Sequence, residues 1–227
     1  MMCDARVFYA QFTTLSAEFP ITFAPITMGE RMEEFASQIL TCLPPKFALA
    51  GMDIGGMVAM EILRRAPERV TRVAFISTNA QSNTPEISAL REPSIITAKS
   101  GRLNDVMQTE INPAWLSRDP TYRMDVMSLM TDMATALGAD VYVRQSRAMQ
   151  RRKDQQDIMR LIKQPALVMC GDYNGQHSVR RHEFLTELIP YTQLEVIPNA
   201  GHIPTLENPD AVTDAIRRRM RQPLVLR

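Results

Sequence analysis

The hydrophobic positions of the chain alternate between two spacings. Short apolar runs are typical of strands, and apolar positions three or four residues apart are typical of helices. The two kinds of segment follow one another, which predicts an α/β fold built on a doubly wound, mostly parallel sheet. The expected strands are 21–26, 47–52, 73–77, 166–170 and 193–197, and the expected helices are 5–18, 32–43, 57–63, 178–189 and 209–221.

Residues 84–160 interrupt this alternation. Helix-spaced stretches at 103–110, 122–137 and 141–156 succeed one another there without a strand signal. They are rich in methionine, whose flexible apolar side chain suits either a roof over a substrate or plain packing. The chain therefore divides into a core of residues 1–83 and 161–227 and a helical segment at 84–160.

Composition excludes several classes of protein. A chain of 227 residues with 45% hydrophobic and 22% charged residues fits one globular domain. A net charge of +1 gives no electrostatic reason to expect a nucleic acid or a membrane surface as partner. Three cysteines without metal-ligand spacing suggest a reduced, cytoplasmic protein.

The most informative segment runs from residue 47 to residue 63. A short apolar run ends in Gly51-x-Asp53-x-Gly55, and a helical pattern follows. This is the layout of a nucleophile elbow, in which the central residue takes a strained turn and its side chain stands clear of the sheet. The usual occupant is Ser, and here it is Asp53.

With this elbow, the chain resembles the α/β-hydrolase superfamily. Residues 167–174 resemble the strand and loop that carry the triad acid, and residues 194–207 resemble the last strand and the loop of the catalytic His, here His202. The order of the three segments is that of the family, and they cover most of the chain outside 84–160. The resemblance implies an α/β-hydrolase fold in which 84–160 is a helical cap.

Two departures from the family pattern affect the chemistry. The position of the triad acid is taken by Asn174, with Asp172 two places earlier. The chain also starts with Met1 where an oxyanion loop normally precedes Cys3, so we expect either a shortened form or a sheet that lacks a central strand. An uncovered sheet edge would favour self-association into a homo-oligomer.

The resemblance implies roles for the remaining site residues. Oxyanion donors would come from the N–H of Ile54 and from Met2, with Met52 beside the pocket. Possible substrate contacts in the cap are Tyr122, Tyr142 and Trp115, although two cap tyrosines also arise easily by coincidence. His177 and His182 have no comparable context and are expected on an exposed helix surface.

Asp53 and His202 together predict a small-molecule hydrolase that needs no cofactor. A carboxylate at the elbow can attack an electrophilic carbon, and His202 can activate the water that releases the product. Family members with this Asp act on carbon–halogen or epoxide bonds, and an ester is the other candidate. Asn174 can orient His202 but adds no charge. The alternative is a silent ligand-binding pseudohydrolase in which Asp53 and His202 form a structural ion pair.

Overall fold

A four-stranded parallel sheet forms the centre of the computed structural model, which describes residues 1–222. The strands lie side by side in chain order, and their registers pair Gly51 with Phe75 and Ile76 with Met169. Their carboxyl ends therefore meet at one edge, where the site residues lie. The strands are β1 (Phe47–Met52), β2 (Val70–Ile76), β3 (Ala166–Gly171) and β4 (Thr192–Ile197).

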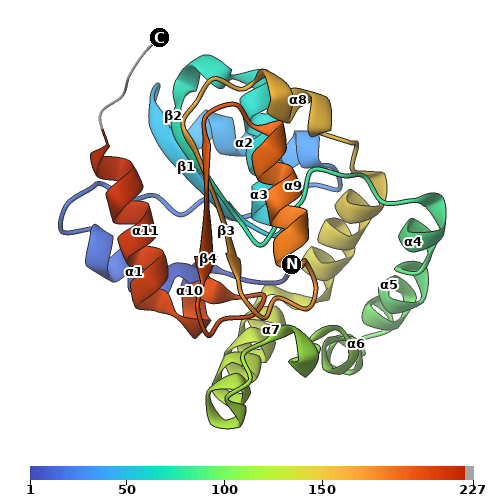
Figure 1. The fold of residues 1–227 in the computed structure, drawn as a ribbon. Coiled ribbons are helices and arrows are strands. Elements are labelled where there is room, and N and C mark those ends of the chain that lie inside the picture. The colour runs from blue at the N-terminus through green and yellow to red at the C-terminus, as the bar shows by residue number, and fades with distance from the viewer. Residues whose placement is uncertain (223–227) are drawn as a thin grey trace.

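Helices cover both faces of the sheet (Figure 1). One face packs against α2 (Met32–Cys42), α3 (Ile54–Arg65), α8 (Gln156–Leu161) and α9 (Val179–Leu188). The other packs against α11 (Pro209–Arg221), on which α1 (Tyr9–Leu15) lies. Short turns of helix complete this part: η1 (Ala5–Phe8), η2 (Pro67–Arg69) and α10 (Pro204–Glu207). The architecture is the α/β-hydrolase type that the sequence predicts.

The inserted segment forms a helical layer near the carboxyl ends of the strands (Figure 1). Its elements are α4 (Pro85–Ala89), α5 (Glu92–Lys99), α6 (Leu103–Glu110), η3 (Pro113–Trp115) and α7 (Pro120–Arg151). Gly138, with φ of 80°, breaks α7 between the two helices that the sequence predicts. This layer has its own hydrophobic cluster, whereas α8 packs on α3 and α9. We propose that this helical layer is the cap that the sequence predicts at 84–160, although α8, at the end of that range, packs on the core.

None of the helices in residues 1–222 combines the length and the hydrophobicity needed to cross a lipid bilayer.

The prediction of a strand at 21–26 is wrong. The segment is irregular, and it lies between the end of α1 and the start of α2. A strand needs a backbone partner, and Pro20 and Pro25 each remove an N–H donor from this stretch. Its β-prone side chains were therefore a misleading signal.

β1 stands at one end of the sheet order, so one of its edges has no strand beside it in the described chain. Exposed edges of this kind favour pairing with another chain. The expected homo-oligomer stays a prediction, which sedimentation at micromolar concentration can check.

Candidate active site

Asp53 occupies a strained turn between β1 and α3. Its φ of 48° and ψ of −114° lie in a region that non-glycine residues rarely adopt. The turn is tight because a Cβ on Gly51 would lie 2.3 Å from the carbonyl oxygen of Gly55, and one on Gly56 would lie 2.5 Å from Thr78. The Asp53 side chain caps no helix N–H, so its carboxylate is free for other partners.

The Asp53 carboxylate is buried among positive and titratable groups. It is 5% exposed, and its Oδ2 lies 2.5 Å from the amino group of Met1. Its Oδ1 has no hydrogen bond within residues 1–222 and lies 3.9 Å from His177 Nε2. Burial alone would raise the pKa of Asp53, but the Met1 amine, His202 and His177 outweigh it and lower the pKa. Asp53 is therefore an anion at neutral pH.

His202 lies in the loop after β4, in contact with the cap. Its backbone N–H donates to the carbonyl of Trp115 at 2.6 Å, and the two rings meet edge to face with centroids 6.3 Å apart. Its Nδ1 is buried without a hydrogen bond, and the structure shows no direct hydrogen bond or ion pair between His202 and Asp53. Burial lowers the pKa of His202 to about 3, so the imidazole is neutral.

The loop of His202 is held by the buried carboxylate of Glu207. Oε2 accepts hydrogen bonds from the N–H groups of Gly201 at 3.0 Å and Ile203 at 2.9 Å, on either side of the histidine. Oε1 accepts from the N–H of Ser117 in the cap. Glu207, which the sequence analysis did not single out, therefore ties the His loop to the cap.

Asn174 organises its own loop and does not bond to His202. Its Oδ1 accepts from the N–H groups of Gln176 at 3.2 Å and His177 at 2.9 Å, and its Nδ2 donates to Ser77 Oγ at 3.2 Å. Asp172 does not replace it, because its Oδ1 accepts from the N–H of Ala200 at 3.1 Å. No carboxylate from this loop orients His202.

His177 and His182 are buried, so their prediction as exposed residues is wrong. His177 is 8% exposed and His182 is fully buried. The His177 ring lies 5.7 Å from the ring of His202 and 6.4 Å from that of His182, measured between centroids. Burial lowers the pKa of His177 to about 4. Only its place three residues after Asn174, in the loop assigned to the acid, could have pointed to it.

The expected oxyanion donors differ in availability. Ile54 is the first residue of α3, where a helix leaves its N–H groups without intrahelical partners. The N–H of Met2 is taken by Gln145 Oε1 at 2.8 Å. Met52 is buried, and its Sδ accepts from Thr205. Of the two expected donors, Ile54 is thus the one whose N–H is left for a substrate oxygen among the described residues.

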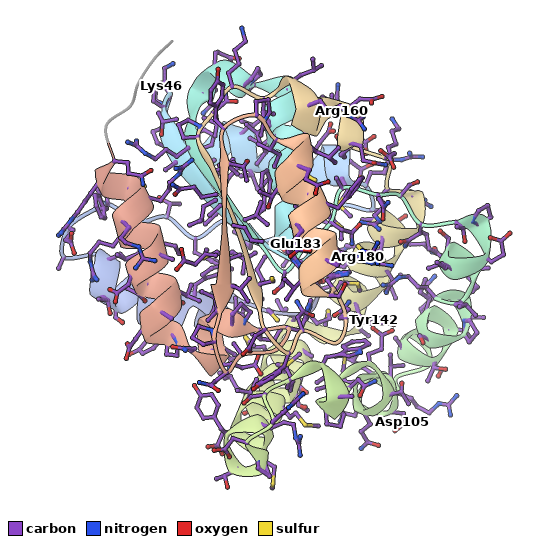
Figure 2. The ribbon with its side chains drawn as sticks, viewed as in Figure 1. Lys46, Asp105, Tyr142, Arg160, Arg180 and Glu183 are labelled. Carbon is purple, nitrogen blue, oxygen red and sulfur yellow. The ribbon has the colours of Figure 1, made fainter. Side chains whose placement is uncertain are left out.

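The three candidate contact residues of the cap also differ in whether they lie near His202 and have a group available to a substrate. Trp115 lies beside His202, whereas both tyrosine hydroxyls are engaged elsewhere. Tyr122 donates to the carbonyl of Leu206, and Tyr142 donates to Glu110. Burial and the Glu110 charge raise the pKa of Tyr142, which lies among the cap helices (Figure 2). Among residues 1–222 no three His, Cys, Asp or Glu side chains are grouped so as to hold a metal ion.

Comparison with known proteins agrees with this arrangement. Residues 15–215 match the alpha/beta hydrolase family. The chain therefore belongs to this family.

Similar curated proteins carry several activities. The chain is 24% identical to the biotin biosynthesis bifunctional protein BioHC of Teredinibacter turnerae, with 84% of this chain but 36% of that protein aligned. It is 20% identical to the pimeloyl-[acyl-carrier protein] methyl ester esterase of Vibrio parahaemolyticus, over 83% and 76% of the two chains. The chain thus spans about a third of BioHC and about three quarters of the esterase.

Solved structures show the same fold. An esterase from Thermogutta terrifontis, solved with malate bound, superposes with a TM-score of 0.87 at 25% identity, over 96% of this chain and 86% of that one. The enol-lactonase of Burkholderia xenovorans superposes with a TM-score of 0.82 at 21% identity, over 97% and 87%.

Proposed function

We propose that the protein hydrolyses a small-molecule carboxylic ester or lactone without a cofactor, with His202 as the general base and Asp53 as the carboxylate that supports it. The position of Asp53 carries the proposal, because its buried anion stands at the strained elbow, in the same cluster as His202 and His177. The esterases and lactonase among the similar proteins support an ester-type substrate.

For an ester, water is a better nucleophile in this site than Asp53. A tetrahedral adduct of Asp53 would expel the carboxylate more readily than an alkoxide, because a carboxylate is by far the weaker base. Neutral His202 can instead take a proton from water as the oxygen attacks the carbonyl carbon. The N–H of Ile54 can donate to the oxyanion, and the imidazolium then gives its proton to the leaving alkoxide.

Asp53 supports this cycle through its charge. Its negative charge raises the pKa of His202 against the effect of burial, which means that it stabilises the imidazolium. In a serine triad the acid loop supplies this charge, and here Asn174 is neutral. Asp53 thereby takes over the acid's electrostatic role while it occupies the nucleophile's position.

Isotope labelling tests the proposal. During repeated turnover of p-nitrophenyl acetate in H₂¹⁸O, the label is expected in the acetate and not in the peptide that contains Asp53. Label in Asp53 would contradict water attack and support the covalent route of carbon–halogen or epoxide chemistry. His202→Gln is expected to lower kcat by ~10² or more, since general-base catalysis contributes ~10² to 10⁴.

A second candidate is a silent ligand-binding protein. It is favoured by the absence of a direct Asp53–His202 bond and by the low exposure of both residues, 5% each. In that case ester hydrolysis would not exceed the rate of the His202→Gln variant. A carboxylic acid added as a ligand would still bind to such a protein and raise its free energy of unfolding.

A further inference from the structure

Arg152 is a half-buried cation whose hydrogen-bond partners are all neutral. It directly follows α7, and its Nη2 donates to Asn79 Oδ1 at 3.1 Å and to Asn83 Oδ1 at 2.8 Å. Its Nη1 lies 3.2 Å from Met57 Sδ, and its Nε is buried without a partner in the described part of the chain. Within residues 1–222 no carboxylate forms an ion pair with it. A cation this far out of water, with a buried Nε, is normally paired with an anion, so this guanidinium keeps unused capacity for one.

A short series of contacts joins Arg152 to the elbow. Asn79, whose Oδ1 accepts from Arg152, places its Nδ2 3.5 Å from His177 Nε2. The same His177 nitrogen lies 3.9 Å from Asp53 Oδ1. Arg152 therefore belongs to the polar cluster of the candidate active site, although α7 brings it there from the cap.

The surroundings of Arg152 add positive charge. Arg91 and Arg181 also form no ion pair within the described residues, and Nη1 of Arg91 contacts the sulfur of Met1 at 3.3 Å. Burial, helped by the charges of Arg91 and Arg181, lowers the pKa of Arg152 to about 10 against the opposing charges of Asp53 and Asp154. The side chain is still a cation at neutral pH.

The other acidic neighbour, Asp154, is already used by its own loop. Its oxygens accept from the N–H of Ser82 at 3.3 Å, from the N–H of Gln156 at 2.9 Å and from the Gln156 side chain at 2.9 Å. Asp154 raises the pKa of Arg152 through space but does not bond to it. The guanidinium is thus left for a ligand.

Space for such a ligand begins beside Arg152. A cavity of about 10 Å³ lies between Arg152, Asn79 and the side chains of Met32, Met57 and Met60. This volume holds about one water molecule, or one oxygen of an anion. Methionine side chains repack easily, so the cavity can widen as a ligand enters.

We propose that Arg152 binds an anionic group of the substrate, a carboxylate or a phosphate, and that Arg91 and Arg181 strengthen its attraction for that group. The inference rests on the proposed function, because it places a second polar group on the molecule whose ester is hydrolysed at Asp53 and His202. A guanidinium suits both anions, because it stays charged and its remaining Nε and Nη1 hydrogens can bind their oxygens.

Two substrates of equal chain length test this inference. Monomethyl adipate carries a carboxylate, and methyl hexanoate is neutral. We expect the wild type to prefer monomethyl adipate in kcat/KM. Arg152→Gln should lower that value by about 10- to 100-fold, the range for a lost charged hydrogen bond, with less than a threefold change for methyl hexanoate. Arg151→Gln is the matched control, because Arg151 is exposed and paired with Glu30 at 2.8 Å.

Binding provides a readout that does not depend on turnover. Adipate and glycerol phosphate are titrated separately by calorimetry, with Arg152→Lys as a variant that keeps the charge. Binding of either anion to the wild type and to Arg152→Lys, but tenfold weaker binding to Arg152→Gln, supports the inference even if no ester is hydrolysed. The stronger of the two anions identifies the group. Equal effects of Arg152→Gln on both esters, or equal anion binding by all variants, would overturn it and leave the hydrolase proposal standing.

Discussion

The elbow after β1 and the loop after β3 lie at the same edge of the sheet but hold their shapes by different means. At the elbow, Gly51 admits no side chain because the backbone of Gly55 lies against it, and Gly56 admits none because the side chain of Thr78 does. The Asp53 side chain caps none of the N–H groups of α3. In the loop after β3, the side-chain oxygen of Asn174 holds the N–H groups of residues 176 and 177.

This difference explains how a family member tolerates both departures at once. An elbow shaped by glycines accepts a carboxylate in place of the usual hydroxyl, because the side chain does not hold the turn itself; its ion pair is with the amino group of Met1. A loop shaped by one acceptor oxygen accepts Asn in place of Asp, because an amide oxygen accepts the same hydrogen bonds. The site thus keeps one carboxylate, at the elbow, and loses the one that the family places after β3.

Restoring the family's usual pair is expected to have the largest effect. Asp53→Ser alone should be a poor esterase, because Asn174 supplies no charge to His202. The double variant Asp53→Ser with Asn174→Asp should exceed it by ~10² or more in kcat/KM on p-nitrophenyl acetate, since losing this charge in a serine triad costs ~10⁴. Equal rates for the two variants would show that Asn174 is not the vacated acid position.

Removing the close approach at the elbow should be the next largest effect. Gly51→Ala places a Cβ 2.3 Å from the Gly55 carbonyl, and backbone must move to admit it. We expect the free energy of unfolding in urea to fall by roughly 3 kcal/mol or more. Gly55→Ala is the control, because its Cβ would meet only Ile26, at 3.7 Å. Similar losses for both variants would contradict a backbone-shaped elbow.

The buried histidines predict how stability depends on pH. The pKa values of His177, about 4, and His202, about 3, lie below the ordinary 6.5, so the unfolded chain binds more protons as the pH falls from 6.5. Stability should fall with pH, by roughly 2 kcal/mol for each histidine at pH 5. Urea midpoints at pH 7.5, 6 and 5 measure this dependence, and His177→Gln should flatten it. If His177→Gln left the slope of unfolding free energy against pH unchanged, His177 would be exposed to water in the folded protein and not buried.

The smallest expected effect concerns the loop after β3. Asn174→Ala removes the acceptor of two backbone N–H groups and the donor to Ser77, and we expect a loss of about 1 to 2 kcal/mol in unfolding free energy. Asp172→Asn in the same loop keeps an acceptor for the N–H of Ala200 and should change stability by less than about 0.5 kcal/mol. A cost for Asn174→Ala no larger than that control would mean that the loop keeps its shape without Asn174.

The sequence predicted correctly those elements whose signal lies within a few neighbouring residues. The glycines around Asp53 and the apolar runs of β1, β2, β3 and β4 are visible without any partner. The prediction of a strand at 21–26 was wrong because a strand forms only where a neighbouring strand pairs with it through backbone hydrogen bonds. The burial of His177 and the unpaired state of Arg152 depend on segments distant in sequence, so neither shows in a local pattern.

The order of the strands also bears on how the protein can change over generations. β2 and β3 are neighbours in the sheet, yet the whole chain from residue 77 to residue 165 lies between them. Closing a loop of ~90 residues costs about 4 kcal/mol in chain entropy, and doubling its length adds only about 0.6 kcal/mol. Insertions or deletions within residues 77–165 therefore change the free energy of pairing β2 with β3 only slightly. The chain can exchange the residues over its site, Trp115 and Arg152 among them, while β2 and β3 stay paired.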